Sequence, residues 1–120
     1  MLLRGTAFIR GQHVWFSITE PTALHSNVLC INLTSLDEEC PDDECQLTNA
    51  DYAWVKDGHK TAVAFSRAQI FDPVKIEKCI RSGILKTPHQ GNVPAITLEK
   101  VIAAARSSRE LSSDKKALLV

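Results

Sequence analysis

Short apolar runs separated by turn-forming residues fill the first 35 positions of the chain, a pattern typical of β-strands. Residues 6–9 and 13–19 are rich in β-branched and aromatic side chains, and Gly11-Gln12 separates them. Residues 27–34 are almost continuously apolar, which predicts a central strand with both faces buried. We therefore expect three consecutive strands in this part of the chain.

Two further strand candidates follow at residues 51–55 and 61–71. The first is short and is closed by the turn signal Lys56-Asp57-Gly58. The second joins two apolar stretches, and we expect it to form one long strand with a bulge near Ser66-Arg67.

The hydrophobic period changes after residue 71 and predicts two helices. Asp72-Pro73 is a good helix start, because Asp caps the first turn and Pro suits the first helical position. Gly83 is a suitable stop for this helix, since glycine adopts the left-handed conformation. Thr97 is the expected N-cap of the second helix, whose apolar residues recur at helical spacing: Leu98, Val101, Ile102 and Ala105. The apolar tail at 117–120 is expected either to dock on the domain or to contact a partner.

These elements predict one α+β domain spanning residues 1–120, since 120 residues is close to the commonest size of a single domain. We expect the β part at roughly 5–71, the helical part at roughly 72–110 and the tail at 111–120. The apolar fraction of 44% and the charged fraction of 23% are those of an ordinary globular protein.

The 14 basic and 14 acidic residues balance, but they are unevenly distributed. Residues 1–60 carry four Lys or Arg against nine Asp or Glu, whereas residues 61–120 carry ten against five. Such a chain can present a basic face to RNA or to an acidic partner, or its helices can simply carry solvated charges. The composition excludes a strongly basic nucleic-acid-binding protein.

The N-terminal residues lack the apolar core and cleavage site of a signal peptide, and no apolar run approaches the roughly 18 residues of a membrane span. We therefore expect a cytoplasmic protein without membrane contact, whose cysteines are free thiols. Cys30 and Cys79 lie in apolar runs and are expected to be small core residues.

Residues 37–45 hold six carboxylates in nine positions, which predicts an exposed loop. Cys40 and Cys45 within this loop have the spacing C-x₄-C, and His25 or His59 could complete a zinc site only through the fold. Because the spacing fits zinc poorly, we expect neither a metal nor another cofactor.

Polar side chains at strand ends are the remaining candidates for chemistry. His13 can accept a proton from an RNA 2′-hydroxyl, and its protonated form can stabilise phosphate charge, so it is expected to act as general base or acid. The hydroxyl of Thr34 can hydrogen-bond a phosphate oxygen. Arg67 or Lys56 can neutralise the charge of the pentavalent phosphorane that forms during cleavage. Each residue also has an ordinary alternative: a hydrogen bond at a strand end, a turn cap formed by Thr34-Ser35, or a solvated charge.

Two segments resemble toxins of the MazF/PemK type. Residues 28–35, VLCINLTS, resemble the strand that in these toxins runs apolar into a Thr-Thr or Thr-Ser pair. Residues 69–72, QIFD, resemble the family's Asp-Gln-Ile-Arg-Thr-Val-Asp strand, which leads into a helix. The order of the elements agrees over residues 5–105, and residues 61–85 resemble a PemK-like branch in which His replaces a strand-opening Arg.

This resemblance implies an SH3-like small β-barrel with C-terminal helices. It also implies a homodimer that cuts single-stranded RNA without a metal, blocked by the disordered segment of a cognate antitoxin. Thr34 takes the place of the family's phosphate-contacting Thr, and Ser35 takes the place of its neighbour. His13 stands where the catalytic Arg is expected, so the group that stabilises charge is altered.

Further departures from the family pattern lie near the second segment. Ala68 replaces the Asp that precedes Gln69, and Arg67 is one position away from the basic residue of the PemK-like branch. The resulting hypothesis is an endoribonuclease with His13, Thr34 and Arg67 as catalytic residues. Ser35, Lys56 and Gln69 are its expected substrate-binding residues. The alternative is a non-catalytic SH3-like barrel that binds a protein or a nucleic acid.

Overall fold

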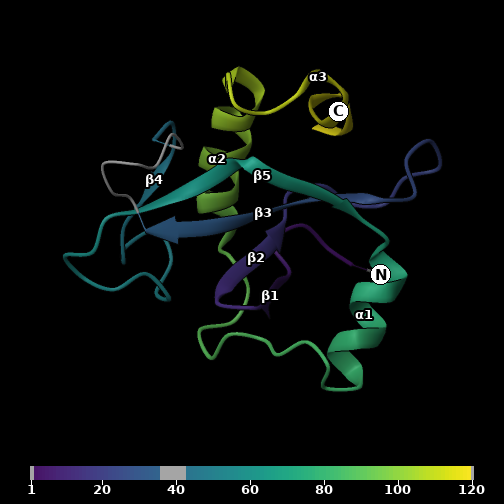
Figure 1. Ribbon diagram of the computed structural model, residues 1–120, viewed down its shortest axis with the longest axis horizontal. Coiled ribbons are helices and arrows are strands. Elements are labelled where there is room, and N and C mark those ends of the chain that lie inside the picture. The colour runs from purple at the N-terminus through teal and green to yellow at the C-terminus, as the bar shows by residue number, and fades with distance from the viewer. Residues whose placement is uncertain (1, 36–42, 120) are drawn as a thin grey trace.

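The computed structural model describes residues 2–35 and 43–119 as an α+β fold built on a curled, five-stranded antiparallel sheet, an open half-barrel (Figure 1). The strand order is β1-β2-β3-β5-β4. The strands are β1 (Ala7–Arg10), β2 (His13–Ser17), β3 (Val28–Ser35), β4 (Gln46–Leu47) and β5 (Thr61–Phe71). The helices are α1 (Pro73–Arg81), α2 (Ala95–Ser107), α3 (Ser113–Lys116) and the short 3₁₀ helix η1 (Ala117–Leu119).

The first three strands lie close to where the sequence predicts three consecutive strands, and they pair as an antiparallel meander. β1 and β2 are joined by a two-residue turn, with Arg10 opposite His13. Gly11 opens this turn with a φ of 64°. Glycine at the first central position is typical of the type II′ turn, whose twist matches that of the flanking strands. β2 in turn pairs antiparallel with β3, which places the start of β2 next to the end of β3 at one end of the sheet.

β5 is one long strand with an irregularity in its middle, which confirms the predicted bulge. Asn32 pairs with Ala64, whereas Cys30 pairs with Gln69, so four residues of β5 lie opposite the single residue Ile31. Extra residues on one strand bend it and increase its twist. β5 accordingly bends where it crosses β3 in Figure 1, which gives the sheet its curl.

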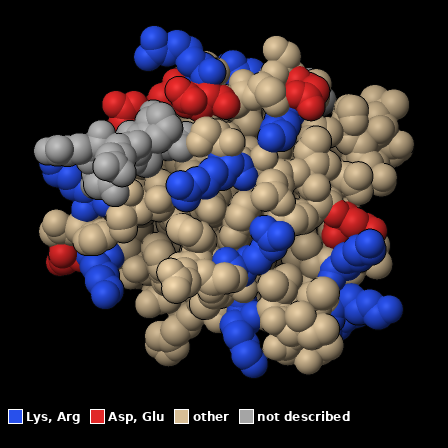
Figure 2. All heavy atoms as spheres, in the orientation of Figure 1, with Lys and Arg blue, Asp and Glu red and all other residues tan. Residues whose placement is uncertain are grey.

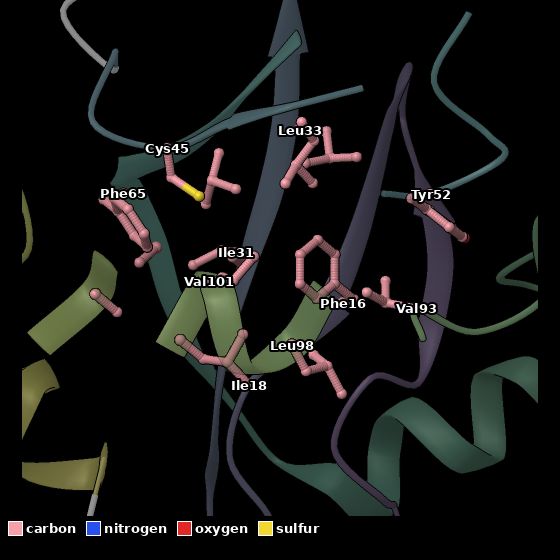
Figure 3. Packing of buried hydrophobic residues seen from close by; sticks show 14 of the residues in the cluster. Phe16, Ile18, Ile31, Leu33, Cys45, Tyr52, Phe65, Val93, Leu98 and Val101 are labelled. Carbon is pink, nitrogen blue, oxygen red and sulfur yellow. The ribbon is translucent and has the colours of Figure 1, made fainter. Parts of the chain in front are cut away.

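The main core lies between one face of the sheet and α2. Phe16, Ile31 and Leu33 project from the strands toward Leu98 and Val101 of the helix (Figure 3). These positions alternate along β2 and β3, as side chains on one face of a strand must. Buried residues from the loops complete this layer, among them Tyr52 and Val93.

The opposite face of the sheet packs against α1. Trp15 and Cys30 lie in this second cluster with Ile76 of the helix. The guanidinium of Arg10 lies 5.5 Å from the ring centre of Trp15 and 5.3 Å from that of Phe71. β3 therefore has both faces buried, as its continuous apolar sequence predicts.

α1 begins as expected. The side chain of Asp72 accepts a hydrogen bond from the backbone N–H of Val74, and Pro73 occupies the first turn. Ser82 is the C-cap, and Gly83 follows with a φ of 79°. The helix is thus set by its own end residues, which is why the sequence pattern locates it well.

The predicted start of α2 is wrong by three residues, because the N-cap is Pro94 and not Thr97. The helix begins at Ala95 after Pro94, and Thr97 lies inside its first turn. The Thr97 hydroxyl donates to the backbone carbonyl of Asp51 rather than capping its own helix. A tertiary contact therefore uses the side chain that the local pattern assigns to a cap.

The predicted strand at 51–55 is also wrong, because this segment consists of turns. The backbone N–H groups of Asp51 and Tyr52 both donate to the carbonyl of Thr48. The side-chain amide of Asn49 donates to the carbonyls of Ala53 and Val55. These local bonds satisfy backbone groups that a strand would pair with a neighbour. The short β4 pairs with β5 instead.

The C-terminal tail docks on the molecule, one of the two outcomes expected for it. Leu111 and Leu119 are buried in the main core, and Arg106 donates to the carbonyl of Leu119. Among the described residues, no helix is long and apolar enough to span a membrane.

The cysteines differ in burial. Cys30 is fully buried, as predicted, whereas Cys79 is only half-buried. Cys45 is 4% exposed in the main core, so its prediction as part of an exposed loop is wrong. Its carbonyl accepts a bond from the N–H of Val63, which draws it onto the sheet. The rest of the predicted acidic loop, apart from Asp43 and Glu44, lies outside the described residues.

The charges do not form one continuous patch on the face shown in Figure 2. Among the described residues on that face, lysines and arginines are separated by uncharged side chains, and the acidic side chains lie mainly toward its upper edge. The uneven charge along the sequence is therefore spread out in space on this face.

Candidate functional site

A pocket of about 680 Å³ lies at the end of the sheet where β2 begins, β3 ends and β5 begins. Its first wall consists of these strand ends, its second of residues 49–59, and its third of residues 88–90. The lining residues are Ile9, Gln12, His13, Leu33, Thr34, Ser35, Asn49, Ala53, Trp54, Val55, Lys56, His59, Thr61, Pro88, His89 and Gln90. A concave space of this size is the usual form of a small-ligand site.

Four of the six residues predicted for the site line this pocket. His13 comes from the start of β2, and Thr34 and Ser35 come from the end of β3. Lys56 comes from the second wall. The antiparallel meander brings His13, Thr34 and Ser35 together, since it places the start of β2 next to the end of β3.

Arg67 and Gln69 lie apart from this pocket. Both are exposed residues of β5, at and just after its bulge. Arg67 is six residues further along the strand than Thr61, which corresponds to roughly 20 Å at about 3.3 Å per residue. Neither residue is among those that line the pocket with His13.

His13 is held in a defined orientation. Its Nδ1 lies 3.1 Å from the carbonyl oxygen of Leu33 on the neighbouring strand. A carbonyl oxygen only accepts, so Nδ1 must carry the proton. In the neutral ring, Nε2 is then the nitrogen with the free lone pair, and the ring can accept a proton there.

His59 forms a hydroxyl–imidazole pair with Ser35. The Nε2 of His59 lies 3.0 Å from the Oγ of Ser35. Both side chains are exposed to solvent at the pocket. A protonated His59 donates to the serine oxygen, and a neutral ring can accept from the serine hydroxyl.

His89 brings a third imidazole, from the loop before α2. Three of the four histidines of the chain thus line one pocket, and His25 lies in the turn after β2. The sequence marks His59 only as a possible zinc ligand and gives no expected role to His89. Neither lies in a strand or helix, so no periodic pattern marks them.

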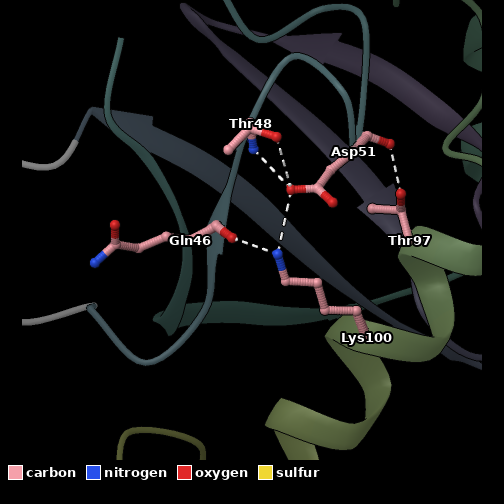
Figure 4. Close-up of polar contacts among 5 residues, drawn as sticks. All are labelled: Gln46, Thr48, Asp51, Thr97 and Lys100. Carbon is pink, nitrogen blue, oxygen red and sulfur yellow. Dashed lines mark hydrogen bonds and ion pairs between the residues drawn. The ribbon is translucent and has the colours of Figure 1, made fainter. Parts of the chain in front are cut away.

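The second wall is tied to α2 by a network around Asp51 (Figure 4). The Asp51 carboxylate accepts from the backbone N–H of Thr48 at 2.8 Å and from Lys100 at 3.2 Å. Lys100 also donates to the carbonyl of Gln46 at 2.8 Å. The Thr48 hydrogen bond, assisted by Lys100, lowers the pKa of Asp51 below its ordinary value. The carboxylate is therefore kept charged and fixes the start of the loop on the helix.

Tyr52 links the second wall to the third. It is 2% exposed, and its hydroxyl donates to the carbonyl of Gly91 at 2.6 Å. Burial raises the pKa of Tyr52 to about 12, so the phenol remains a donor at neutral pH. The loops that carry Trp54, Lys56 and His89 are thereby held against each other from within the core.

Within residues 2–35 and 43–119, no group of three His, Cys, Asp or Glu side chains is placed to hold a metal ion. Cys45 packs in the main core away from the pocket lining, and Cys40, the other half of the zinc alternative, lies outside these residues. The described groups of the pocket instead offer imidazoles, an ammonium group and hydroxyls.

No family model matches the chain, and no curated protein or solved structure is significantly similar to it.

Proposed function

We propose that this chain is a toxin-type endoribonuclease that cuts single-stranded RNA without a metal. The observation that carries the proposal is the convergence of His13, His59 and His89 with Lys56 in one pocket. Imidazoles can supply both a base and an acid near neutral pH, and an ammonium group can stabilise phosphate charge. The side chains of the pocket thus include every group that RNA cleavage requires.

The reaction is an in-line transfer within the RNA itself. The base removes the proton of a ribose 2′-hydroxyl, and the oxygen forms a bond to the adjacent phosphorus. The bond from phosphorus to the 5′-oxygen of the next nucleotide breaks, and the acid protonates that leaving oxygen. The products are a 2′,3′-cyclic phosphate and a 5′-hydroxyl end, so atoms and charge balance without water or a cofactor.

His13 is the base in this scheme. Its hydrogen bond to Leu33 fixes the proton on Nδ1 and leaves Nε2 to accept the proton of the 2′-hydroxyl. Thr34 lies on the strand beside it and supplies a hydroxyl to a phosphate oxygen.

His59 is the acid, and Ser35 holds it. A protonated His59 is oriented by its contact with the Ser35 oxygen and can release its proton to the leaving oxygen. Lys56 replaces Arg67 as the group that neutralises the phosphorane, because Lys56 lines the pocket and Arg67 does not. His89 adds a third imidazole from the third wall.

The proposal includes the finer fold assignment, in which the curled sheet is an SH3-like barrel with appended helices. It also includes a homodimer in the cytoplasm and a cognate antitoxin that covers the pocket. The support for these parts is the resemblance of residues 28–35 and 69–72 to MazF/PemK-type toxins, together with the order of the elements.

The test is cleavage of a single-stranded RNA by purified protein in EDTA, with four single variants. His13→Ala and His59→Ala should each lower the cleavage rate by roughly 10²- to 10⁴-fold, the usual contribution of a general acid or base. Lys56→Ala should lower it through lost charge stabilisation. His25→Ala is the matched control, since it removes the one histidine outside the pocket lining and should leave the rate unchanged.

Cleavage products with 2′,3′-cyclic phosphate ends, lost in the pocket variants and kept in His25→Ala, would support the proposal. RNA left intact by the wild-type chain, or equal cleavage by all variants, would refute it. Intact RNA combined with tight RNA or protein binding at the pocket would favour the non-catalytic barrel.

A further inference from the structure

Trp54 is a large aromatic residue in the second wall of the pocket. It is half-buried, packs by one part against the main core and borders the pocket with Lys56, two residues away. The other tryptophan, Trp15, is 4% exposed on the opposite side of the sheet. Trp54 is therefore the indole available to a molecule in the pocket.

The backbone on both sides of Trp54 is braced. The Asn49 amide donates to the carbonyl of Ala53 at 3.3 Å and to that of Val55 at 2.8 Å. Val55 is buried, and Tyr52 fixes the preceding turn through Gly91. The indole thus lies on a preorganised loop, so binding of a ligand to it costs little conformational entropy of the loop.

A half-buried indole and an ammonium group that line the same pocket match the two parts of a nucleotide. Nucleobases stack on aromatic side chains, while lysines contact the phosphates beside them. An apolar ligand without charge would offer the Lys56 ammonium group no counter-charge. A nucleotide satisfies both kinds of group at once.

We propose that Trp54 is the stacking platform for one unpaired base, held next to the phosphate that Lys56 contacts. This inference rests on the proposed function and adds to it the residue that selects unpaired nucleotides. A base within a duplex is stacked on both sides and must be extruded before it can reach a pocket. Stacking on Trp54 between the walls therefore favours single strands over duplexes.

The experiment uses DNA oligonucleotides, which lack the 2′-hydroxyl and stay intact, with the wild-type chain and three variants. The probes are a single strand, its duplex and an abasic single strand of equal length. Trp54→Leu removes the stacking face and keeps apolar bulk, and Trp54→Phe keeps an aromatic ring. Val74→Ala is the control, since it trims a residue that is 67% exposed on α1 outside the pocket lining.

We expect the single strand to quench tryptophan fluorescence and the abasic strand to bind with little quenching. Trp54→Leu should weaken single-strand binding by about 5- to 150-fold, the loss expected for one stacked base, and leave abasic binding unchanged. Trp54→Phe should retain most of the affinity, and Val74→Ala all of it. The duplex should bind no more tightly than the abasic strand.

Unchanged single-strand affinity in Trp54→Leu, or equal quenching by single and abasic strands, would overturn the stacking role. The quenching comparison uses only the wild-type chain, so it decides the question even if Trp54→Leu fails to fold. RNA cleavage is scored separately: cleavage without base-dependent quenching refutes the stacking alone. Base-dependent quenching without cleavage refutes the nuclease and keeps the base site.

Discussion

Gly5 offers a direct test of how the segment before α2 is held to the sheet. Its N–H donates to the carbonyl of Ser17 at 2.7 Å, and its carbonyl accepts from Val93 at 2.9 Å. Its φ is 85°, in the left-handed region. A Cβ placed on it would lie 2.7 Å from Cδ1 of Leu98 and 2.9 Å from the carbonyl oxygen of Val93. The Leu98 methyl can rotate away, whereas the carbonyl belongs to the backbone.

Gly5→Ala should therefore combine two costs. The left-handed conformation costs an alanine about 1–2 kcal/mol. Overpacking against Leu98 and Val93 adds about 1–3 kcal/mol. Gly11→Ala is the matched control, because Gly11 has a φ of 64° and nothing within 4 Å of the added Cβ. Gly11→Ala should incur only the cost of the left-handed conformation and not that of overpacking. The effect of alanine on the unfolded chain is common to both variants.

The assay is urea unfolding at 25 °C, followed by the fluorescence of the buried Trp15. The free energy of unfolding should be lower in Gly5→Ala than in Gly11→Ala by about 1–3 kcal/mol, with similar m-values. Equal midpoints for the two variants would refute the reasoning, since they would mean that the close contact at Gly5 costs nothing.

Two further predictions concern contacts that join distant segments. Tyr52→Phe should lower the free energy of unfolding by about 0.5–1.5 kcal/mol, because the Gly91 carbonyl loses its donor. It should also slow the proposed RNA cleavage, because the third wall is held less firmly. An unchanged urea midpoint would contradict the expected loss of stability. Glu44 accepts hydrogen bonds from the Ser108 hydroxyl and from the N–H of Arg109, and these bonds lower its pKa below the ordinary value of 4.5. Its stabilising contribution is therefore present above about pH 4.5 and is lost as the pH falls further. Glu44→Gln should lower the urea midpoint at pH 7 and flatten the decline of that midpoint in acid. Parallel pH profiles for the variant and the wild type would argue against a stabilising role of these hydrogen bonds.

The elements that the sequence predicts well are those fixed by local interactions. α1 carries its own cap at Asp72 and its own stop near Gly83, and the strands of the meander carry their own alternation. The bulge in β5 is also predicted from the local sequence, near Ser66-Arg67. Each of these features depends on residues within a few positions of each other, so a single sequence contains the information.

The elements predicted wrongly are those decided by contacts between distant segments. Thr97 resembles a cap, but its hydroxyl bonds to Asp51, 46 positions earlier. Residues 51–55 have the composition of a strand, but their backbone is satisfied by Thr48 and Asn49. Cys45 follows a run of carboxylates, yet pairing with Val63 buries it. Propensity is a weak prior where tertiary hydrogen bonds compete with it.

The residues of the candidate site also fall into those that the sequence predicts and those that depend on contacts between distant segments. His13 begins one predicted strand, and Thr34 and Ser35 end the next; the antiparallel pairing of β2 with β3 then brings them to one end of the sheet. His59, His89 and Trp54 lie on loops, and their place in the pocket depends on Tyr52, Asp51 and Lys100. None of those three residues is itself a lining residue of the pocket, yet they set where its second and third walls stand. A substitution at Tyr52 or Lys100 should therefore change activity more than its modest effect on stability suggests, because a displacement of about 1 Å in a positioning group can cost on the order of 10²-fold in rate.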